Sequence, residues 1–146
     1  MFEALRRMLA NDTEDRLDVA DEKVAFAALL VRLARADEHY AEAEKRSILG
    51  VLRENYDLDA AGAQDLLTEG ERFETEAPDT QRFTHRLKQA VPYEERIHLV
   101  ESLWTVALSD GNRDSEEDGF LRLVVSLLGV SDPDSGMARQ RAMKKI

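Results

Sequence analysis

Four carboxylates in this sequence form two matching pairs whose residue types suit a divalent cation: Asp37 with Glu44, and Asp110 with Glu117. In each pair the aspartate continues the apolar stripe of one predicted helix, and the glutamate stands on the core-facing stripe of the next. A carboxylate placed there needs a cation, a basic side chain or backbone N–H groups as its partner. These four acids are therefore the candidate metal ligands. His39 adds a possible nitrogen ligand, although a lone loop histidine is far more often simply exposed.

The second pair lies in the stretch "SDGNRDSEEDGF", which begins like a calcium-binding loop. A twelve-residue EF-hand loop that starts at Asp110 requires glycine at its sixth position and glutamate at its twelfth. The chain has Ser115 and Leu121 at those positions. The missing bidentate glutamate is the strongest ligand of such a loop, so the sequence excludes an EF-hand.

The same stretch also fits a purely structural role in ending one helix and starting the next. Gly111 can adopt the left-handed conformation that ends a helix, while Asp114 and Glu117 fit a capping box. The first loop, "ADEHYAEAE", has Glu38 in place of the glycine and Ala41 in place of the capping aspartate. Its two acids persist although its turn residues are gone, which favours a second role such as a shared divalent cation.

The elements that must position these acids are helices, because every convincing hydrophobic period is close to 3.6 residues. The pattern predicts an all-α fold, a single compact domain with about seven or eight helices. Capping signals come from Asp59 and Asp79, Pro78 and Pro92 mark helix boundaries, and Asp132 stands before Pro133 in the last helix. The expected helices are an opening one that carries Phe2, Leu5 and Leu9, then 21–35, 42–56, one from Asp59 to Pro78, one through Phe83 and Leu87, one from Pro92 to Leu108, 115–128, and one from Asp132 to the end.

A second regularity appears when the chain is shifted by 73 residues, because apolar and acidic positions then coincide. This predicts a pseudo-duplicated helix–loop–helix unit. We expect one domain over residues 1–146 with its core at about 20–135, a first repeat at about 24–59 and a second at about 97–132. The matched pairs are Phe26 with Leu99, Leu30 with Leu103, Leu33 with Val106, Ala34 with Ala107, Asp37 with Asp110, Glu44 with Glu117, Ile48 with Leu121, Val51 with Val124, Leu52 with Val125, and Asp59 with Asp132.

Composition narrows the class of protein. Hydrophobic residues make up 43% and charged residues 34%, which is typical of a globular protein, and the net charge of −10 argues against nucleic acid as a partner. The basic tail, with Arg139, Arg141, Lys144 and Lys145, is expected to solvate a last helix. Without cysteines, a secretion signal or a stretch of about 20 apolar residues, we expect a cytoplasmic protein with no stable membrane insertion.

Other candidate chemistry is weaker. His98 and Glu101 share a helical face, but a lone His-x-x-Glu pair is too common to indicate a metal. No serine shows a histidine and an acid around it that would indicate nucleophilic catalysis. Trp104 is expected in the core, with lining of a partner groove as the alternative. The opening stretch "MFEALRRML" is expected to pack onto the domain rather than onto a membrane.

The two loops "ADEHYAEAEKRSIL" and "SDGNRDSEEDGFLRLV" resemble the tellurite-resistance TerB-like family. A related domain precedes the J-domain in a membrane-anchored bacterial co-chaperone. The resemblance covers residues of about 20 to 135 and implies a compact all-helical domain with a possible shared metal site. Carried over by position, it implicates Asp37, Glu44, Asp110 and Glu117, with Glu38 departing from the usual glycine.

Three hypotheses follow for function. The first is a non-enzymatic TerB-like helical domain that serves as an interaction or stress-response module and binds a divalent cation through its paired acidic loops. The second is a metal-dependent enzyme in which a carboxylate-bound ion activates water. The third is an adaptor domain that binds a helix of a protein partner without any metal.

Overall fold

The computed structural model describes residues 22–36, 40, 42–77, 79–109 and 115–145, and for residues 115–117 it describes the backbone alone. Within these ranges every regular element is a helix, which confirms the all-α prediction. The predicted opening helix with Phe2, Leu5 and Leu9 lies outside the described residues. The helices are residues 22–34, α2 (Glu42–Tyr56), α3 (Ala60–Glu76), α4 (Gln81–Ala90), α5 (Tyr93–Ala107), α6 (Ser115–Leu127) and α7 (Asp132–Lys144).

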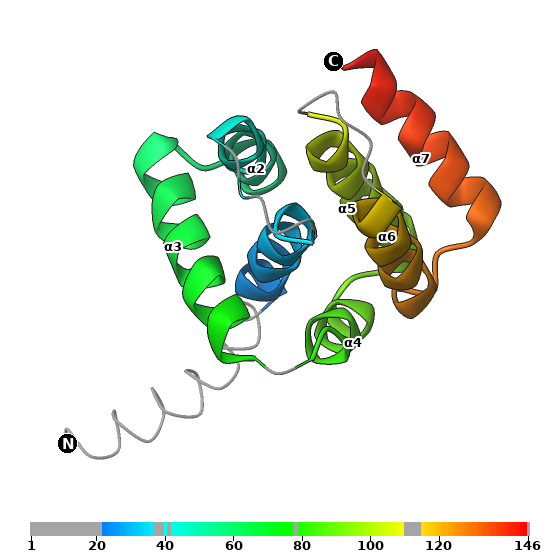
Figure 1. The fold of residues 1–146 in the computed structure, drawn as a ribbon, viewed down its shortest axis with the longest axis horizontal. Coiled ribbons are helices and arrows are strands. Elements are labelled where there is room, and N and C mark those ends of the chain that lie inside the picture. Colours follow the sequence, from blue (N-terminus) through cyan, green and yellow to red (C-terminus); the bar gives the residue numbers. More distant parts are fainter. Residues whose placement is uncertain (1–21, 37–39, 41, 78, 110–114, 146) are drawn as a thin grey trace.

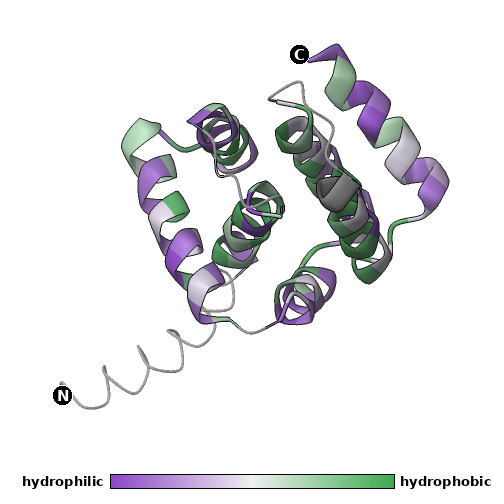
Figure 2. Cartoon of the chain, viewed as in Figure 1, coloured by the Kyte–Doolittle hydropathy of each residue, from purple (hydrophilic) through white to green (hydrophobic). Residues whose placement is uncertain are grey.

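Residues 22–34, here called the central helix, lie in the middle of the fold between α2, α3, α4 and α5 (Figure 1). From Ala25 to Ala34 every side chain except that of Arg32 is buried. The sequence predicted a helix with one apolar stripe, but from Ala25 to Ala34 apolar residues cover all of this helix except the position of Arg32. A helix of that kind is stable only when neighbours cover all its sides, so it forms the centre of the core (Figure 2).

The predicted capping residues account for several helix boundaries. The Asp59 carboxylate accepts a 2.7 Å hydrogen bond from the Gly62 N–H and so caps α3. The Asp79 carboxylate accepts a 2.9 Å bond from the Arg82 N–H in the first turn of α4. α5 begins directly after Pro92, where the missing proline N–H costs nothing. The two aspartate caps satisfy N–H groups that have no partner inside their own helix.

A close approach between α3 and the central helix depends on a glycine. A Cβ atom added at Gly70 would lie 2.6 Å from the Ala27 Cβ and 3.0 Å from backbone atoms of Ala27 and Ala28. Only a residue without a side chain permits this spacing. Because backbone lies on the other side of the contact, the neighbouring helix has no flexible group that could move away.

Two sets of three consecutive helices follow the same order. We call the central helix, α2 and α3 the first unit, and α5, α6 and α7 the second unit. α2 packs against α3 and α5, α7 packs against α5, and α4 packs between the units against α5 and α6. The Asn55 amide donates a 2.9 Å hydrogen bond to the Ser102 hydroxyl and so links α2 directly to α5.

Candidate functional site

Glu44 is the one predicted ligand whose side chain the structure describes. It lies in the first turn of α2 and is 1% exposed, so the predicted core-facing placement of this acid is confirmed. Asp37, Asp110 and the predicted cap Asp114 lie outside the described residues, as does His39. Glu117 lies in helix α6, but its side chain is outside the described part. Within the described residues, no three histidine or acidic side chains gather closely enough to hold a metal ion.

The surroundings of Glu44 are strongly charged. Tyr40 lies between two cations, with Lys45 Nζ 4.8 Å and the Arg35 guanidinium carbon 5.0 Å from the centre of its ring. Burial is the largest cause that raises the pKa of the Tyr40 hydroxyl, and the nearby carboxylates of Glu71 and Glu44 raise it further. The hydroxyl therefore stays protonated at neutral pH. Glu44 thus lies near a cluster of acidic and basic side chains around Tyr40.

The same cluster connects the end of the central helix to α3. Arg35 forms a 2.8 Å ion pair with Glu74, and Lys45 lies 3.9 Å from a carboxylate oxygen of Glu71. Arg32 donates 2.9 Å hydrogen bonds to the carbonyl oxygens of Glu74 and Ala77, which belong to the last turn and the C-cap of α3. These carbonyls have no partner within their own helix. The cluster therefore fixes the helices on either side of the first acidic loop.

Two features of Glu44 suit a ligand for a cation. It occupies the N-terminal turn of α2, where the partial positive charge of the helix is favourable to an anion. A carboxylate offers oxygen ligands, which hard cations such as Ca²⁺, Mg²⁺ and Mn²⁺ prefer. A buried carboxylate beside a polar loop is therefore a suitable donor for such an ion.

The second unit repeats the burial pattern that the shift of 73 residues predicts. Ile48 and Leu121 are both fully buried, and so are Leu30 and Leu103. The repeat also continues at the ends of α2 and α6. There the Leu58 N–H bonds to the Arg53 carbonyl and the Val130 N–H to the Val125 carbonyl, each at 3.1 Å, and each turn contains one residue with positive φ: Asp57 (52°) and Gly129 (71°).

One predicted correspondence is off by a single residue. The sequence pairs Asp59 with Asp132 at an offset of 73, but the hydroxyl of Ser131 is the N-cap of α7 and accepts the Asp134 N–H. From the last turn of α6 onward the two units therefore correspond at an offset of 72, as the matching bonds at Arg53 and Val125 already show. Asp132 occupies the first helical position instead, where its charge still suits the helix dipole.

Sequence reasoning undervalued Glu101, which joins α5 to α7. Its side chain is 8% exposed, with Arg141 Nε and Lys145 Nζ each 3.4 Å from its carboxylate and His98 Nδ1 at 3.7 Å. The basic tail, expected to be solvated, therefore supplies two cations to a buried acid. The sequence signal that could have identified Glu101 is its position on the otherwise apolar stripe of α5.

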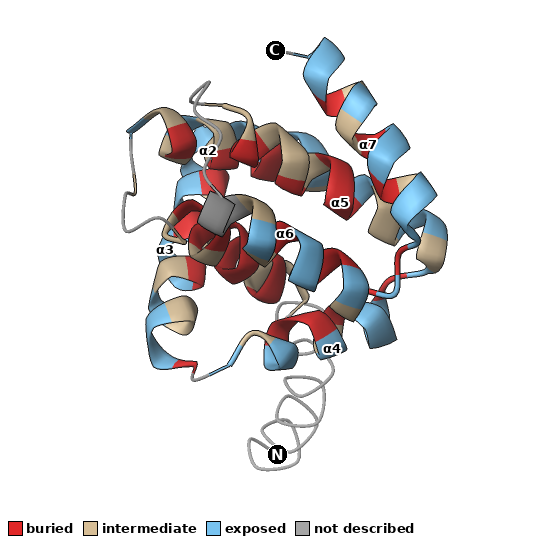
Figure 3. Cartoon of the chain, turned by 45° about the vertical axis from the view of Figure 1, so that its right-hand side comes forward, coloured by how far each residue is buried: buried red, intermediate tan, exposed pale blue. Residues whose placement is uncertain are grey.

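Trp104 departs from its predicted core position. It is only partly buried, its indole N–H donates a 3.2 Å hydrogen bond to Ser135, and the Arg139 guanidinium lies 5.2 Å from its ring centre. Trp104 lines a hollow of about 220 Å³ between α6 and α7. Figure 3 shows α7 at the edge of the molecule beside α5. The other lining residues are Asp118, Arg122, Val125, Asp132, Ser135, Gly136 and Arg139. The alternative prediction, a groove, describes this residue better than the core does.

Comparison with known proteins places this fold in a family. The sequence model described as tellurite resistance protein TerB matches residues 23–140. This range contains the central helix and both acidic loops, so the chain belongs to the TerB family, and the resemblance predicted from the two loops is confirmed. No curated protein and no solved structure matches the chain. None of the described helices is long and apolar enough to cross a bilayer.

Proposed function

We propose that this chain is a non-enzymatic interaction module that binds a divalent cation between its two acidic loops. The observation that carries the proposal is the burial of Glu44, 1% exposed in the first turn of α2. Asp37 precedes it in the same loop, and Asp110 with Glu117 takes the matching positions in the second unit. The family description, tellurite resistance, supports a role in a stress response.

The donor set suggests which cations to test. All four acids offer oxygen, and the chain contains no cysteine. Oxygen-only sites favour Ca²⁺, Mg²⁺ or Mn²⁺ over Zn²⁺, which prefers nitrogen and sulfur ligands. We infer that the ion links the two loops and so presents them as one ordered surface to a partner protein.

A thermal unfolding series tests the proposal. A ligand that binds only the folded state raises the melting temperature as its concentration rises. We expect Ca²⁺, Mg²⁺ or Mn²⁺ to raise it for the natural chain, and Asp37→Asn with Asp110→Asn to abolish the shift. Asp57→Asn with Asp65→Asn removes the same charge from exposed positions outside the acidic loops and is the matched control. No shift with any ion, or an equal shift in the loop variant, would overturn the proposal.

The hollow at Trp104 favours a second candidate, an adaptor that binds a partner helix without metal. The hollow offers Trp104 and Val125 to the apolar face of a helix, and its acidic and basic residues suit charged side chains at the edge of that face. A Cβ added at Gly136, on its wall, meets nothing within 4 Å. Gly136→Leu would fill the groove without disturbing the fold. We expect this variant to lose any partner that the natural chain captures.

Gly119→Leu is the control for this experiment, because Gly119 is exposed on α6 with equally open space around it and does not line the hollow. A partner captured equally by all three chains would contradict the adaptor hypothesis.

A further inference from the structure

Helix α4 is basic in an acidic protein. Its sequence, QRFTHRLKQA, contains no acid, although the chain has 30 acidic residues. Phe83 and Leu87 are fully buried and hold the helix against the core. Arg82, His85 and Lys88 recur at every third position, so they form one exposed stripe along the helix. The packing of α4 does not require this stripe to be basic.

The basic stripe lines a hollow of about 430 Å³ between α4 and α6, here called the α4 hollow. Three basic and three uncharged residues form its lining: Arg82, His85, Lys88, Gln81, Thr84 and Leu127. Among the described residues, no carboxylate forms an ion pair with its three basic side chains. By contrast, the hollows at Trp104 and at Tyr56 each include acids. The α4 hollow therefore suits an anion.

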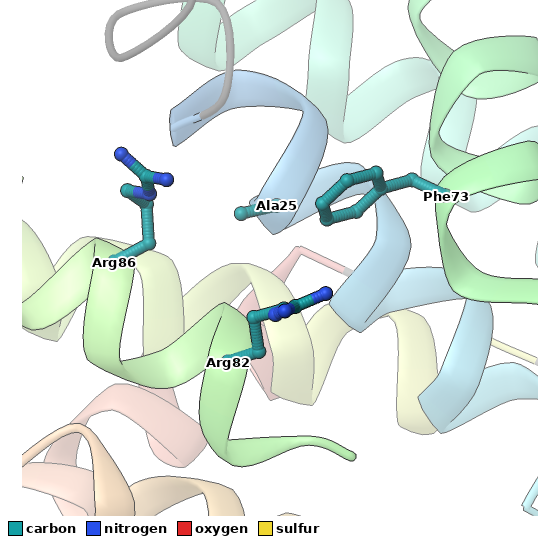
Figure 4. A pocket seen from close by; sticks show the side chains of 4 residues that line it. All are labelled: Ala25, Phe73, Arg82 and Arg86. Atoms are coloured by element: carbon teal, nitrogen blue, oxygen red, sulfur yellow. The ribbon is translucent and has the colours of Figure 1, made fainter. Parts of the chain in front are cut away.

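Arg82 also borders a smaller hollow between α4, α3 and the central helix. That hollow, of about 280 Å³, is lined by Ala25, Phe73, Arg82 and Arg86 (Figure 4). Arg86 already has an interaction partner, so we assign it no part in anion binding. Arg82 is exposed, and its long flexible side chain can turn toward either hollow.

The Lys88 ammonium lies close to another cation at the turn that follows α6. A Cβ atom added at Gly129 would lie 3.6 Å from both Lys88 Nζ and Arg96 Nη1. Arg96 is held there by a 2.9 Å hydrogen bond that it donates to the Leu128 carbonyl. Two like charges that share a small space repel each other, and an anion bound beside Lys88 would reduce that repulsion.

We propose that the α4 hollow binds a phosphate monoester, with the phosphoryl group on Arg82, His85 and Lys88 and the organic part against Leu127. A phosphate monoester carries a charge of about −1.5 to −2 at pH 7 and offers three strong acceptor oxygens. It therefore matches three basic side chains better than a carboxylate, which carries a single charge. Arginine binds phosphate through paired hydrogen bonds, and lysine binds it as a point charge.

A small molecule suits the α4 hollow better than a nucleic acid does. Its volume of about 430 Å³ lies within the range of about 300–1,000 Å³ that is typical of small-molecule sites. The basic stripe is confined to one helix of ten residues, and a long polyanion would extend over a protein of net charge −10. The site lies on α4, outside both acidic loops, and is independent of the cation proposed there.

Calorimetric titration with phenyl phosphate tests the proposal. We expect saturable binding of one molecule per chain. Inorganic phosphate should bind more weakly, because it lacks the ring that would contact Leu127. Benzoate has the same ring but only one negative charge, so it should bind at least about tenfold more weakly than phenyl phosphate.

Three variants locate the site. Arg82→Gln with Lys88→Gln should weaken the binding of phenyl phosphate by about tenfold or more, because two charge-assisted contacts are lost. Arg46→Gln with Arg53→Gln, at exposed positions on α2, removes the same charge and should leave binding unchanged. Leu127→Ser should weaken the binding of phenyl phosphate but not that of inorganic phosphate. Circular dichroism verifies that each variant is folded.

Four results would overturn the proposal. The first is no binding of phenyl phosphate by the natural chain, and the second is equal binding by the two double variants. The third is benzoate that binds as tightly as phenyl phosphate, which would indicate a carboxylate site. The fourth is an oligonucleotide that binds the α4 hollow more tightly than phenyl phosphate, which would indicate a nucleic-acid site. The titrations contain no divalent ion, so failure here is distinguishable from failure of the cation proposal.

Discussion

The two units have the same order of helices and share several buried positions, but they attach their third helix differently. In the first unit α3 packs against α2 and approaches the central helix closely at Gly70. In the second unit α7 packs mainly against α5, and a hollow of about 220 Å³ separates it from α6. We call the contact of α3 in the first unit closed, and the contact of α7 beside the hollow in the second unit open.

The residues at matching positions account for this difference. In the first unit the contact is apolar, and its residues are buried or packed against the core. At four of the five corresponding positions the second unit has a larger or a polar side chain, and only Val125 is neither. At offsets of 73 for α5 and α6 and 72 for α7, the pairs are Val31 with Trp104, Leu49 with Arg122, Leu52 with Val125, Ala63 with Ser135, and Leu67 with Arg139.

Polar contacts to α5 help to hold α7, whose Ala138 and Ala142 are fully buried. Glu101 pairs with Arg141 and Lys145, and the Tyr93 hydroxyl donates a 2.6 Å hydrogen bond to Asp134. One helical arrangement is thus compatible with two kinds of contact: an apolar one in the first unit, and one with polar pairs and a hollow beside it in the second.

An exchange of residues between the units should produce the largest effect. Leu67 is 1% exposed, so Leu67→Arg removes its apolar contacts and places a charge in the core, at an expected cost of about 4 kcal/mol or more in the free energy of unfolding. The reverse change, Arg139→Leu, should alter it by less than about 1 kcal/mol. It loses a cation–π contact but removes a buried Nε that has no hydrogen-bond partner among the described residues. Urea denaturation measures both, and equal effects would refute the distinction between the units.

A glycine replacement probes the closed contact itself. Gly70→Ala should lower the free energy of unfolding by about 1–3 kcal/mol, since the new Cβ would meet Ala27 at 2.6 Å. Gly50→Ala is the control, because it lies in the exposed middle of α2 with nothing within 4 Å. There the better helix propensity of alanine should stabilise the protein by up to about 1 kcal/mol. Thermal melts that shift in the same direction for both variants would contradict the close packing.

The polar attachment of α7 should respond to Glu101→Gln. The change keeps the shape but removes the charge that Arg141 and Lys145 share, so we expect a loss of roughly 1–2 kcal/mol in urea denaturation. Hydrogen exchange should increase in α7 and remain unchanged in α3. Faster exchange in both helices would show that Glu101 supports the whole fold rather than the open unit.

The smallest expected effect is a pH-dependent change in stability that comes from Asp134. The hydrogen bond from Tyr93, followed by that from Ser131, lowers the pKa of Asp134 below its ordinary value of 3.8. A lowered pKa in the folded state stabilises the protein above about pH 4, and this contribution disappears as the pH falls through the folded-state pKa. Tyr93→Phe should therefore lower the melting temperature at neutral pH by more than at about pH 3. A difference that is constant over this range would exclude the carboxylate as its cause.

The sequence was sufficient for much of the fold because the signals were local. The period of apolar residues predicted the helices. Asp59 and Asp79 indicated where two of them begin, because each carboxylate accepts a hydrogen bond from the first turn of the helix that follows it. Asp132 was paired with the cap Asp59, although Ser131, one residue earlier, forms the capping bond. An alignment at a constant offset does not reveal a deletion of one residue within a helical turn.

The candidate sites depended on information that lies between helices. Burial of Glu44 followed from its helical phase, whereas the cations around Tyr40 come from the central helix and α2 and could not be paired from spacing alone. Trp104 looked like a core residue because its neighbours along the helix are apolar. Its side chain instead lines a hollow together with Arg122 of α6 and Arg139 of α7. Spacing along one helix does not reveal which residues of other helices lie beside it. The basic composition of α4 was visible in the sequence, but the hollows beside it were not.

Calorimetric titration of the folded chain with Ca²⁺, Mg²⁺ and Mn²⁺ tests the central claim, that the paired acidic loops bind one divalent cation. The account predicts saturable binding of one ion per chain, with Glu44→Gln and Glu117→Gln each weakening it because the two loops share the ion. No heat of binding for any ion would contradict the account. A site that persists unchanged in both variants would contradict it equally.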